Sequence, residues 1–301
     1  VQRAFPQVRL IQNEVNRGYA GGCNQGIGRA EAPFILLLNN DTVHAENFLG
    51  ELYRTITSDD RIAAVQPKIL SIQNPMRYDY SGAAGGELDI FGYPFARGRV
   101  FDAVEEDLKQ YEDLESTVFW TSGCALIMRK SVVEEVGPLD ETFFAHQEEI
   151  DWNWRVQLAG YRNVVNMKTW VKHYSGYTLR GDNAFKMYLN HRNNLIMMIK
   201  NYSFHLLLLL LPVRLMLELM TVAADLILWD GRRARAVLKA LGYIFTHPSM
   251  MIRMHRGAQR LRRVPDRQVM GNMYGGSIVW QHFLRKKGTS DIVKKFRKQV
   301  A

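Results

Sequence analysis

The chain of 301 residues lacks the features that define several special classes of protein. Its two cysteines, Cys23 and Cys124, are too few for a disulfide framework and form no CxxC pair, so a reducing compartment is expected. Nine prolines and 23 glycines exclude collagen-like or linker-like material. Residues 1–5 have no apolar run typical of a secretory signal. With 47% hydrophobic and 23% charged residues, the chain has the composition of a globular protein.

Acidic residues are scarce in the last part of the chain. Residues 1–180 contain 18 Lys and Arg against 24 Asp and Glu, whereas residues 181–301 contain 21 against 6. We therefore divide the chain into a mildly acidic body, 1–180, and a strongly basic tail, 181–301. Such an asymmetry indicates that the tail meets nucleic acid or an anionic membrane surface.

Short apolar runs alternate with helix-like segments along the body, which predicts an α/β domain with a mainly parallel sheet. Phe34–Leu38 is a continuous apolar run, typical of a strand buried on both faces. Residues 71–115 have little periodicity and are expected to form a long excursion over the sheet, as a lid or acceptor-facing loop. The other strand candidates and the predicted helices are Val8–Gln12, Ile62–Val65, Cys124–Met128 and Thr169–Lys172, and Gln25–Ala30, Asn47–Ile56 and Glu148–Ala159.

The tail begins with an unusually apolar helix at Phe204–Trp229. Its interior charges, Arg214, Glu218 and Asp225, fall within about 40° of one another at 100° per residue, so the rest of the circumference is apolar. Such a helix is expected to lie in a membrane interface or to cross the bilayer with its polar stripe against protein. The alternative is a helical bundle that packs on the body, with its arginines solvated.

A second basic stretch favours the membrane. Between 250 and 267, six arginines interleave with methionine, isoleucine and leucine, which is typical of a helix held on anionic lipid head groups. Nucleic acid is disfavoured, because the chain has no recognition motif and phosphate binding does not need a leucine-rich helix.

Four groups of residues carry possible chemistry. Asn39-Asn40-Asp41 follows the Phe34–Leu38 run, at the end of a strand where open α/β sheets bind ligands. A carboxylate there can hold a divalent cation that bridges two phosphates, although a polar turn explains the same residues. The glycine-rich run 16–27 would let the backbone approach a ligand, or it is a plain strand–helix turn.

The other two groups lie later in the body. Glu148 and Glu149 open a helix after an aromatic segment, and one of them can face a cleft as a general base, although the helix dipole alone favours acids there. Asp151 and Arg155 are i, i+4 partners, which favours a structural pair. His173 follows a predicted strand; it is structural, or it completes a metal site with Asp41.

In this order the motifs resemble the family 2 glycosyltransferases with the GT-A fold, a Rossmann-like, mostly parallel sheet. The similarity is greatest to the rhamnosyltransferase-like bacterial branch that builds cell-surface polysaccharides, and it runs from about Val8 to His173. Six segments carry it: NRGYAGGCNQGI (16–27), FILLLNNDT (34–42), VQPKIL (65–70), SGCALIMRK (122–130), VGPLDETFFAHQEEIDWNWRVQLAGY (136–161) and His173.

The resemblance implies a role for each matching residue. Asp41 is the metal-binding carboxylate for Mg²⁺ or Mn²⁺, with His173 helping to hold the metal or the diphosphate. Glu149, where the family usually has Asp, is the catalytic base, with Glu148 beside it. The implied donor-binding residues are Asn16, Gly18, Asn24, Asn39, Asn40 and Asp41. Trp120 and Asp151 are expected on the acceptor side, although core packing explains Trp120 equally well.

The implied function is that of an inverting glycosyltransferase. It moves a sugar, with rhamnose as the candidate, from a nucleoside-diphosphate donor to a polysaccharide or lipid-linked acceptor for cell-surface glycan synthesis. The expected location is the cytoplasmic face of the cell membrane, with peripheral or monotopic attachment. The alternative is a non-catalytic, membrane-bound sugar-nucleotide-binding subunit or an inactive truncated relic.

The resemblance carries one further expectation, about the start of the chain. In the family, a strand, a helix and a second strand precede the region equivalent to Val8, and a βαβ unit takes roughly 30 residues or more. We therefore expect an amino-terminally truncated domain, in which the strand at Phe34–Leu38 has an uncovered neighbouring position and the affinity for the donor is low.

Overall fold

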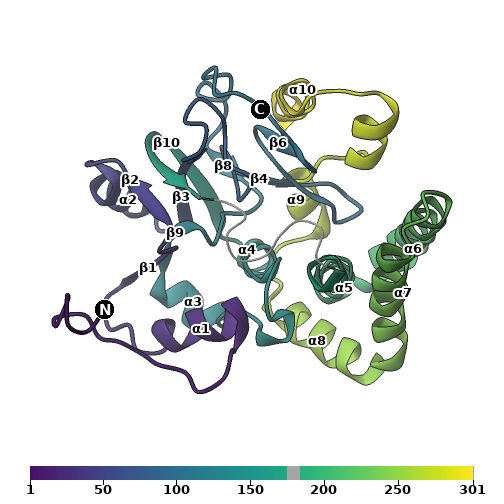
Figure 1. The fold of residues 1–301 in the computed structure, drawn as a ribbon, viewed down its shortest axis with the longest axis horizontal. Coiled ribbons are helices and arrows are strands. Elements are labelled where there is room, and N and C mark those ends of the chain that lie inside the picture. Colours follow the sequence, from purple (N-terminus) through teal and green to yellow (C-terminus); the bar gives the residue numbers. More distant parts are fainter. Residues whose placement is uncertain (175–183, 301) are drawn as a thin grey trace.

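A computed structural model describes residues 1–174 and 184–300, excepting the side chains of 298–300. Its centre is a six-stranded mixed sheet with helices on both faces (Figure 1). The order across the sheet is β1 (Phe34–Leu38), β9 (Ala125–Arg129), β3 (Ile62–Ser71), β10 (Arg162–His173) and β2 (Thr42–His44), and β8 (Thr117–Val118) also pairs with β10.

The sheet is not mostly parallel, which corrects the prediction. Only β3 and β10 pair in parallel among the described strands. β1, β3 and β10 do point the same way, but β9 runs in the opposite direction between β1 and β3. The reason is the path of the chain: Ala125, at the start of β9, lies opposite Leu38, at the end of β1. The chain thus returns from the carboxyl edge without crossing to the other end, and an antiparallel strand needs no crossover.

β1 is an edge strand among the described strands, as expected from the uncovered position beside it. It is not buried on both faces, because Ile35 and Leu37 are buried while Leu38 is 41% exposed. Val8–Gln12 forms no strand and is largely exposed. The glycine-rich run that follows is itself the helix α1 (Gly18–Ile27), so this helix begins earlier than predicted.

The two faces of the sheet are covered by helices whose apolar residues share one side. α2 (Phe48–Thr57) buries Phe48, Leu52 and Ile56, which are spaced four residues apart, against one face. α1, α3 (Lys130–Val136) and α4 (Glu148–Leu158) pack against the other face. The predicted boundaries of α2 and α4 are confirmed to within one residue.

The excursion after β3 has a structure of its own, which its weak periodicity did not predict. It contains a small antiparallel sheet in the order β4 (Gly86–Leu88), β5 (Pro94–Ala96), β6 (Arg99–Val100) and β7 (Ala103–Val104). These strands are only two or three residues long, too short to show alternation in the sequence.

The tail is helical, as predicted, and it packs on the body. Its elements are α5 (Ala184–Asn201), α6 (Phe204–Ile227), α7 (Gly231–Thr246), α8 (Pro248–Leu261), α9 (Asp266–Gly271), the π-helix η2 (Trp280–Leu284) and α10 (Thr289–Val300). One hydrophobic cluster joins Leu88 and Phe95 of the excursion to Met198 and Met251 of the tail. The boundary expected at 180 lies outside the described residues.

α6 carries its charges inward and its apolar side chains outward. Arg214, Glu218 and Asp225 are buried, whereas Leu209 and Met220 are 69% and 58% exposed. Arg214 pairs with Glu218 and donates to the carbonyl of Phe91. α6 is the one described helix that is long and apolar enough to cross a membrane, with a mean hydropathy of 2.1.

Candidate active site

The candidate donor half of the site is built around His173, at the end of β10. Its Nδ1 lies 3.0 Å from a carboxylate oxygen of Asp79, and its Nε2 lies 3.3 Å from Oδ1 of Asp41. The antiparallel pairing of β2 with β10 sets Thr42, next to Asp41, opposite His173. Asn39 also reaches this imidazole, with its Nδ2 3.3 Å from Nε2. The predicted pair Asp41 and His173 is therefore brought together, and Asn40 is exposed beside it.

Two carboxylates set the electrostatics of His173. Burial lowers the pKa of the imidazole, but the hydrogen bond and charge of Asp79, with a smaller contribution from Asp41, raise it above its usual value on balance. Ser81 adds a contact 2.8 Å from Nδ1. The ring is thus held from the Nδ1 side by the 79–81 segment, and its Nε2 is directed toward Asp41.

The side chains around Nε2 fit a divalent cation that is shared with a ligand. Oδ1 of Asp41 is buried and accepts no hydrogen bond from the described residues. A carboxylate behind the other nitrogen, here Asp79, is the usual support for a metal-binding histidine. Within the described residues, no three His, Cys, Asp or Glu side chains are placed to hold a metal by themselves. Phosphate oxygens would have to supply the remaining ligands, as they do in many Mg²⁺ sites.

Polar side chains of the glycine-rich run 16–27 bond to the protein backbone, so they hold the helix α1 in place. The side chain of Asn16 accepts the amide N–H of Gly18 at 2.9 Å, and Asn24 exchanges hydrogen bonds with the backbone of Leu139. Gly18 has φ +70°, and a Cβ there would lie 2.2 Å from the carbonyl oxygen of Phe144. Because only glycine permits this approach, Gly18 allows α1 to pack against the segment that precedes α4.

The acidic pair at the start of α4 forms the other half of the site. Glu148 is buried and Glu149 half-buried, and Oε2 of each carboxylate has no hydrogen-bond partner among the described residues. Burial raises the pKa of Glu149 to about 7. Burial also raises the pKa of Glu148 well above its usual value, and the charge of Glu149 adds to this shift. A carboxyl whose pKa lies near neutrality is suited to general base catalysis.

Two structural connections hold the halves together. Asp79 and Ser81 contact His173, while the ring of Tyr80 between them stacks on Arg99, whose charge lowers the pKa of Glu149. On the other side, the hydroxyl of Tyr19 donates to the carbonyl of Gly123 at 2.5 Å.

The second connection ends at the donor half. The backbone carbonyl of Cys124, next to Gly123, accepts a hydrogen bond from the amide N–H of Asn39 at 2.9 Å. The charges of Glu148 and Glu149 add to the burial that raises the pKa of Tyr19. The side chain of Tyr19 therefore lies between the acidic pair and the loop that carries Asp41.

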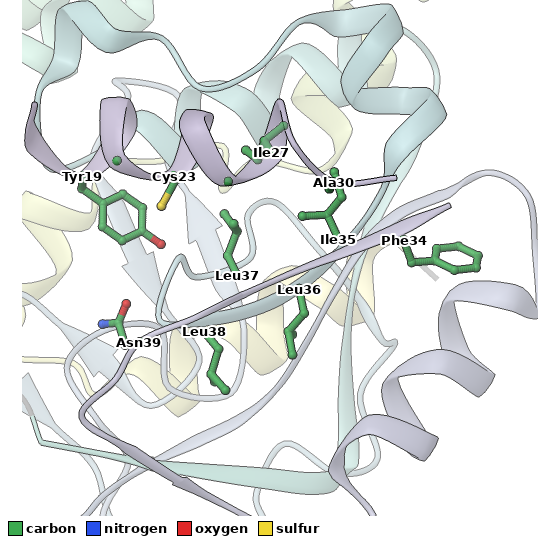
Figure 2. Close-up of a pocket in the computed structure, with 12 residues that line it drawn as sticks. Tyr19, Cys23, Ile27, Ala30, Phe34, Ile35, Leu36, Leu37, Leu38 and Asn39 are labelled. Atoms are coloured by element: carbon green, nitrogen blue, oxygen red, sulfur yellow. The ribbon is translucent and has the colours of Figure 1, made fainter. Parts of the chain in front are cut away.

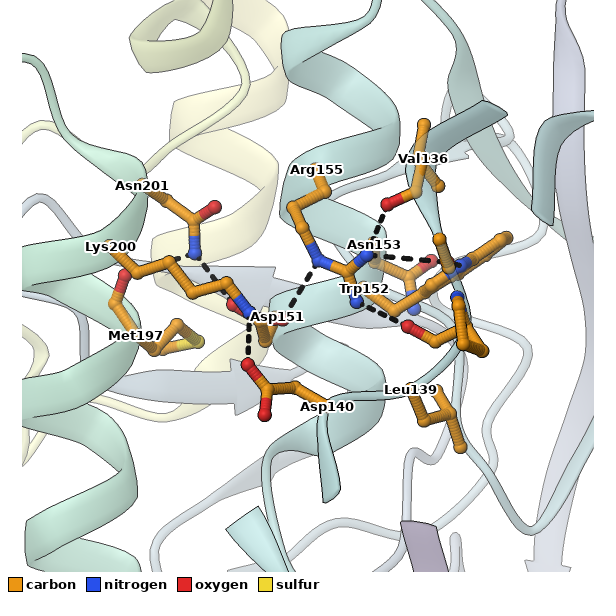
Figure 3. Close-up of polar contacts among 12 residues, drawn as sticks. Val136, Leu139, Asp140, Asp151, Trp152, Asn153, Arg155, Met197, Lys200 and Asn201 are labelled. Atoms are coloured by element: carbon orange, nitrogen blue, oxygen red, sulfur yellow. Dashed lines mark hydrogen bonds and ion pairs between the residues drawn. The ribbon is translucent and has the colours of Figure 1, made fainter. Parts of the chain in front are cut away.

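The two predicted acceptor-side residues are instead enclosed by protein. Asp151 is fully buried and accepts hydrogen bonds from Arg155 at 2.9 Å, Lys200 at 2.8 Å and Asn201 at 2.9 Å (Figure 3). Trp120 is 3% exposed, and its Nε1 donates to the carbonyl of Glu87. Neither side chain has a surface for an acceptor, so both act in packing, and the predicted Asp151–Arg155 pair is confirmed.

An open cleft of about 430 Å³ lies between α1 and β1 and reaches Asn39 at one end (Figure 2). Its walls are largely apolar, with Ile27 from the helix and Ile35 and Leu37 from the strand. Tyr19 and Asn39 are at the same end of the cleft in Figure 2. The cleft follows from the edge position of β1, because no described strand fills the space beside it.

Sequence reasoning missed the segment 79–81 and Arg99, which connect the halves. Both lie in the excursion, where no periodicity or motif marks them. The one available signal was the chemistry of Asp79-Tyr80-Ser81 itself, an acid and a hydroxyl on either side of an aromatic ring.

Comparisons with known proteins point to one family. Residues 1–137 match the sequence profile described as Glycosyl transferase family 2. The chain is 26% identical over 218 residues to an N-acetylglucosaminyl-diphospho-decaprenol L-rhamnosyltransferase of Mycobacterium tuberculosis, covering 67% of this chain and 70% of that protein. It is 24% identical over 199 residues to a low-salt glycan biosynthesis hexosyltransferase of Haloferax volcanii, covering 63% and 59%.

Solved structures of glycosyltransferases are also similar, at low overall scores. GalNAc-T7 with UDP, GalNAc and Mn²⁺ has a TM-score of 0.47 at 17% identity, covering 63% of this chain and 36% of that one. A mannosyltransferase of Pyrobaculum calidifontis with GDP-Man and Mn²⁺ has a TM-score of 0.43 at 12% identity, covering 90% and 68%. Residues 1–137 thus match glycosyl transferase family 2, and the chain is similar to a rhamnosyltransferase over two thirds of its length.

Proposed function

We propose that this glycosyltransferase is an inverting enzyme that moves a sugar, with rhamnose the first candidate, from a nucleoside-diphosphate donor to a lipid-linked or polysaccharide acceptor. The observation that carries the proposal is the pairing of two half-sites. One offers a histidine and a carboxylate suited to a diphosphate with its cation, and the other offers the unpaired carboxyl of Glu149 with a pKa of about 7. The rhamnosyltransferase relative suggests rhamnose and a lipid-diphosphate acceptor.

In the proposed reaction, Glu149 takes the proton of the acceptor hydroxyl while that oxygen attacks the anomeric carbon. The bond between the anomeric carbon and the diphosphate oxygen breaks, and the diphosphate leaves with the bonding electrons. Because a single displacement occurs on the face opposite the leaving group, the configuration is inverted. The low polarity around Glu149 keeps its pKa near neutrality, where a base is both ionised and strong enough to take a proton.

Asp41 and His173 are the residues that would hold Mg²⁺ or Mn²⁺ in this scheme, with Asn39 beside them. When bound, such a cation supplies positive charge against the departing diphosphate. Asp79 and Ser81 orient His173 so that Nε2 is directed to that place. Tyr19 holds the loop before β9 through its hydrogen bond to the carbonyl of Gly123, and Tyr80 stacks on Arg99.

We further propose that α6 places the enzyme on the cytoplasmic face of the cell membrane. The inward charges of α6 already have partners, since Arg214 pairs with Glu218 on the same helix and donates to the carbonyl of Phe91 in the body, so the outward apolar side of α6 is free to enter the lipid interface. Arginines of α7 and α8 would meet anionic head groups. In this arrangement α6 lies on the membrane and does not span it, and the enzyme shares a surface with a lipid-linked acceptor.

Release of nucleoside diphosphate from a panel of activated sugars, with Mn²⁺ or Mg²⁺ and a lipid-linked acceptor, tests the activity. We expect release with one donor class, and loss of release on chelation with EDTA or in Asp41→Ala. His173→Ala should reduce the response to metal less severely. A chain that binds a donor but never releases diphosphate would support the alternative of a non-catalytic binding subunit. Full activity in EDTA would remove the cation from the mechanism.

Sedimentation of the full chain with anionic vesicles tests the membrane proposal. Attachment should be partly sensitive to salt, because arginines supply it, and partly resistant, because apolar side chains supply the rest. The double substitution Leu208→Gln and Leu209→Gln changes only exposed positions of α6 and should weaken the salt-resistant part. Equal sedimentation of this variant and the unmodified chain would contradict the proposal.

A further inference from the structure

Arg99 is a buried cation whose hydrogen-bonding capacity is almost unused. It is 7% exposed, yet its Nη1 makes a single long hydrogen bond of 3.4 Å to the carbonyl of Phe101. Its Nε has no partner, and no carboxylate of the described residues lies within ion-pair distance. A buried guanidinium that lacks partners is costly, because it has lost its hydration without replacement.

The other buried arginines of the described chain show how unusual this is. Arg97, two residues earlier, pairs with Glu87 at 2.8 Å and donates to two backbone carbonyls at 2.7 Å each. Arg214 pairs with Glu218. Arg192 has no carboxylate, but it donates to two carbonyls and to Asn193. Arg99 differs from these three in having neither a carboxylate nor a full set of acceptors, and it is close enough to Glu149 for its charge to lower the pKa of that carboxyl.

A second cation and an aromatic ring complete a platform with Arg99. The ring of Tyr80 is 40% exposed and lies 4.6 Å from the guanidinium carbon of Arg99 and 5.6 Å from Nζ of Lys186. Lys186 has no ion pair with the described residues. Its charge adds to the burial that lowers the pKa of His146 to about 4, so it too lies next to the segment that leads into Glu149.

We propose that Arg99, Tyr80 and Lys186 form a subsite for a diphosphate on the acceptor. This rests on the proposed function, because it takes Glu149 as the group that meets the acceptor hydroxyl. Two cations beside one ring suit an anion with two charged groups, and the planar fork of donors of Arg99 suits phosphate oxygens. Tyr80 is 40% exposed, so part of its side chain can contact a neighbouring sugar ring. The ligand class is therefore a sugar joined to a diphosphate.

The donor also carries a diphosphate, but the donor's diphosphate is assigned to a different site. The candidate donor half is formed by Asp41 and His173, and a cation would be needed there because Asp41 and Asp79 give it negative charge. Binding at Arg99 and Lys186 needs no metal, since both side chains are already positive. Dependence on metal therefore distinguishes the two sources.

Titration of the full chain with inorganic pyrophosphate in EDTA tests the subsite directly, by calorimetry and without turnover. We expect Arg99→Gln to weaken this binding by about tenfold or more, since charge-assisted hydrogen bonds are lost. Lys186→Gln, at a partly exposed position, should weaken it about threefold to tenfold, and Arg99→Lys should restore part of the loss. Arg54→Gln on the exposed side of α2 is the matched control and should bind as the unmodified chain does.

Three results would overturn the assignment. One is pyrophosphate binding that appears only with Mn²⁺ and disappears in Asp41→Asn, because it belongs to the donor half. Another is equal affinity in the unmodified chain and in both Arg99→Gln and Lys186→Gln. The last is sulfate binding as tight as pyrophosphate binding, which indicates general anion attraction. Since the readout is binding, failure here is distinct from failure of the proposed function, which is the absence of transfer with every donor.

Discussion

Glu149 and Asp151 lie two residues apart in the first turn of α4, but their hydrogen-bond partners differ. The helix dipole favours both carboxylates equally. Asp151 is fully buried and accepts hydrogen bonds from Arg155, Lys200 and Asn201. Glu149 keeps an oxygen without a partner and has a pKa raised to about 7. A carboxylate with a full set of partners stabilises the fold, whereas one whose partners are missing remains available for chemistry.

The partners of Asp151 come from the tail, and this explains the contrast. Lys200 and Asn201 lie at the end of α5, and Lys200 also bonds Asp140 at 2.6 Å. The tail therefore neutralises the side of α4 that faces it. Glu148 and Glu149, three and two residues before Asp151, lie near Tyr19 and Arg99, neither of which bonds to their free oxygens. Four predictions test the comparison between these two acids, from the largest expected effect to the smallest.

Glu149→Gln should have the largest effect, and it should be an effect on rate. The amide keeps the shape of the side chain but cannot take a proton, so transfer should fall by about 10²–10⁴ with donor binding little changed. Initial rates with saturating donor measure this. Glu148→Gln is the matched control, and if it is the more impaired of the two variants, the base has been assigned to the wrong member of the pair.

Asp151→Asn should have the second largest effect, and it should be an effect on stability. The change leaves Arg155 in the interior without its counter-charge and Lys200 with Asp140 alone, so we expect a loss of about 3–5 kcal/mol in the free energy of unfolding. Urea unfolding followed by tryptophan fluorescence measures it. The comparison fails if this variant unfolds like the unmodified chain, or if Glu149→Gln loses as much stability.

The pH dependence of transfer should report Glu149. Its pKa is raised, so the carboxylate needed as base is lost by protonation as the pH falls through about 7, and the rate should then drop about tenfold per pH unit. Transfer rates between pH 5 and 8.5 at saturating donor measure this fall at low pH, and Glu149→Gln should remove the pH dependence. A flat profile over this range in the unmodified chain would argue against Glu149 as the base.

Glu134→Gln should have the smallest effect. Its carboxylate is 65% exposed and lies 3.7 Å from Lys130, one turn away on α3. Water already solvates both charges, so the loss should be below about 1 kcal/mol and should shrink with added salt, with no change in transfer rate. The same unfolding and rate measurements apply. A loss as large as that of Asp151→Asn would show that burial does not set the scale of these effects.

The sequence by itself determined the local elements and the pairs that act over short distances. Helical spacing located α2, α4 and α6 to within two residues, since a helix needs only local hydrogen bonds and an apolar face. The i, i+4 spacing predicted the Asp151–Arg155 pair, and the resemblance paired Asp41 with His173. The charge stripe of α6 was also readable, because it depends only on the angle per residue.

Only the tertiary structure decided what each polar group meets. Strand direction depends on where a connection returns, so the antiparallel β9 could not be derived from its apolar residues. Asp79, Tyr80 and Arg99 reach the site through pairings across long stretches of chain that no local pattern marks. Asp151 and Glu149 look alike in sequence, and Lys200 and Asn201, about fifty positions away, make the first structural and leave the second open. Burial and partners are properties of the packed molecule, and they decide which carboxylate keeps its reactivity.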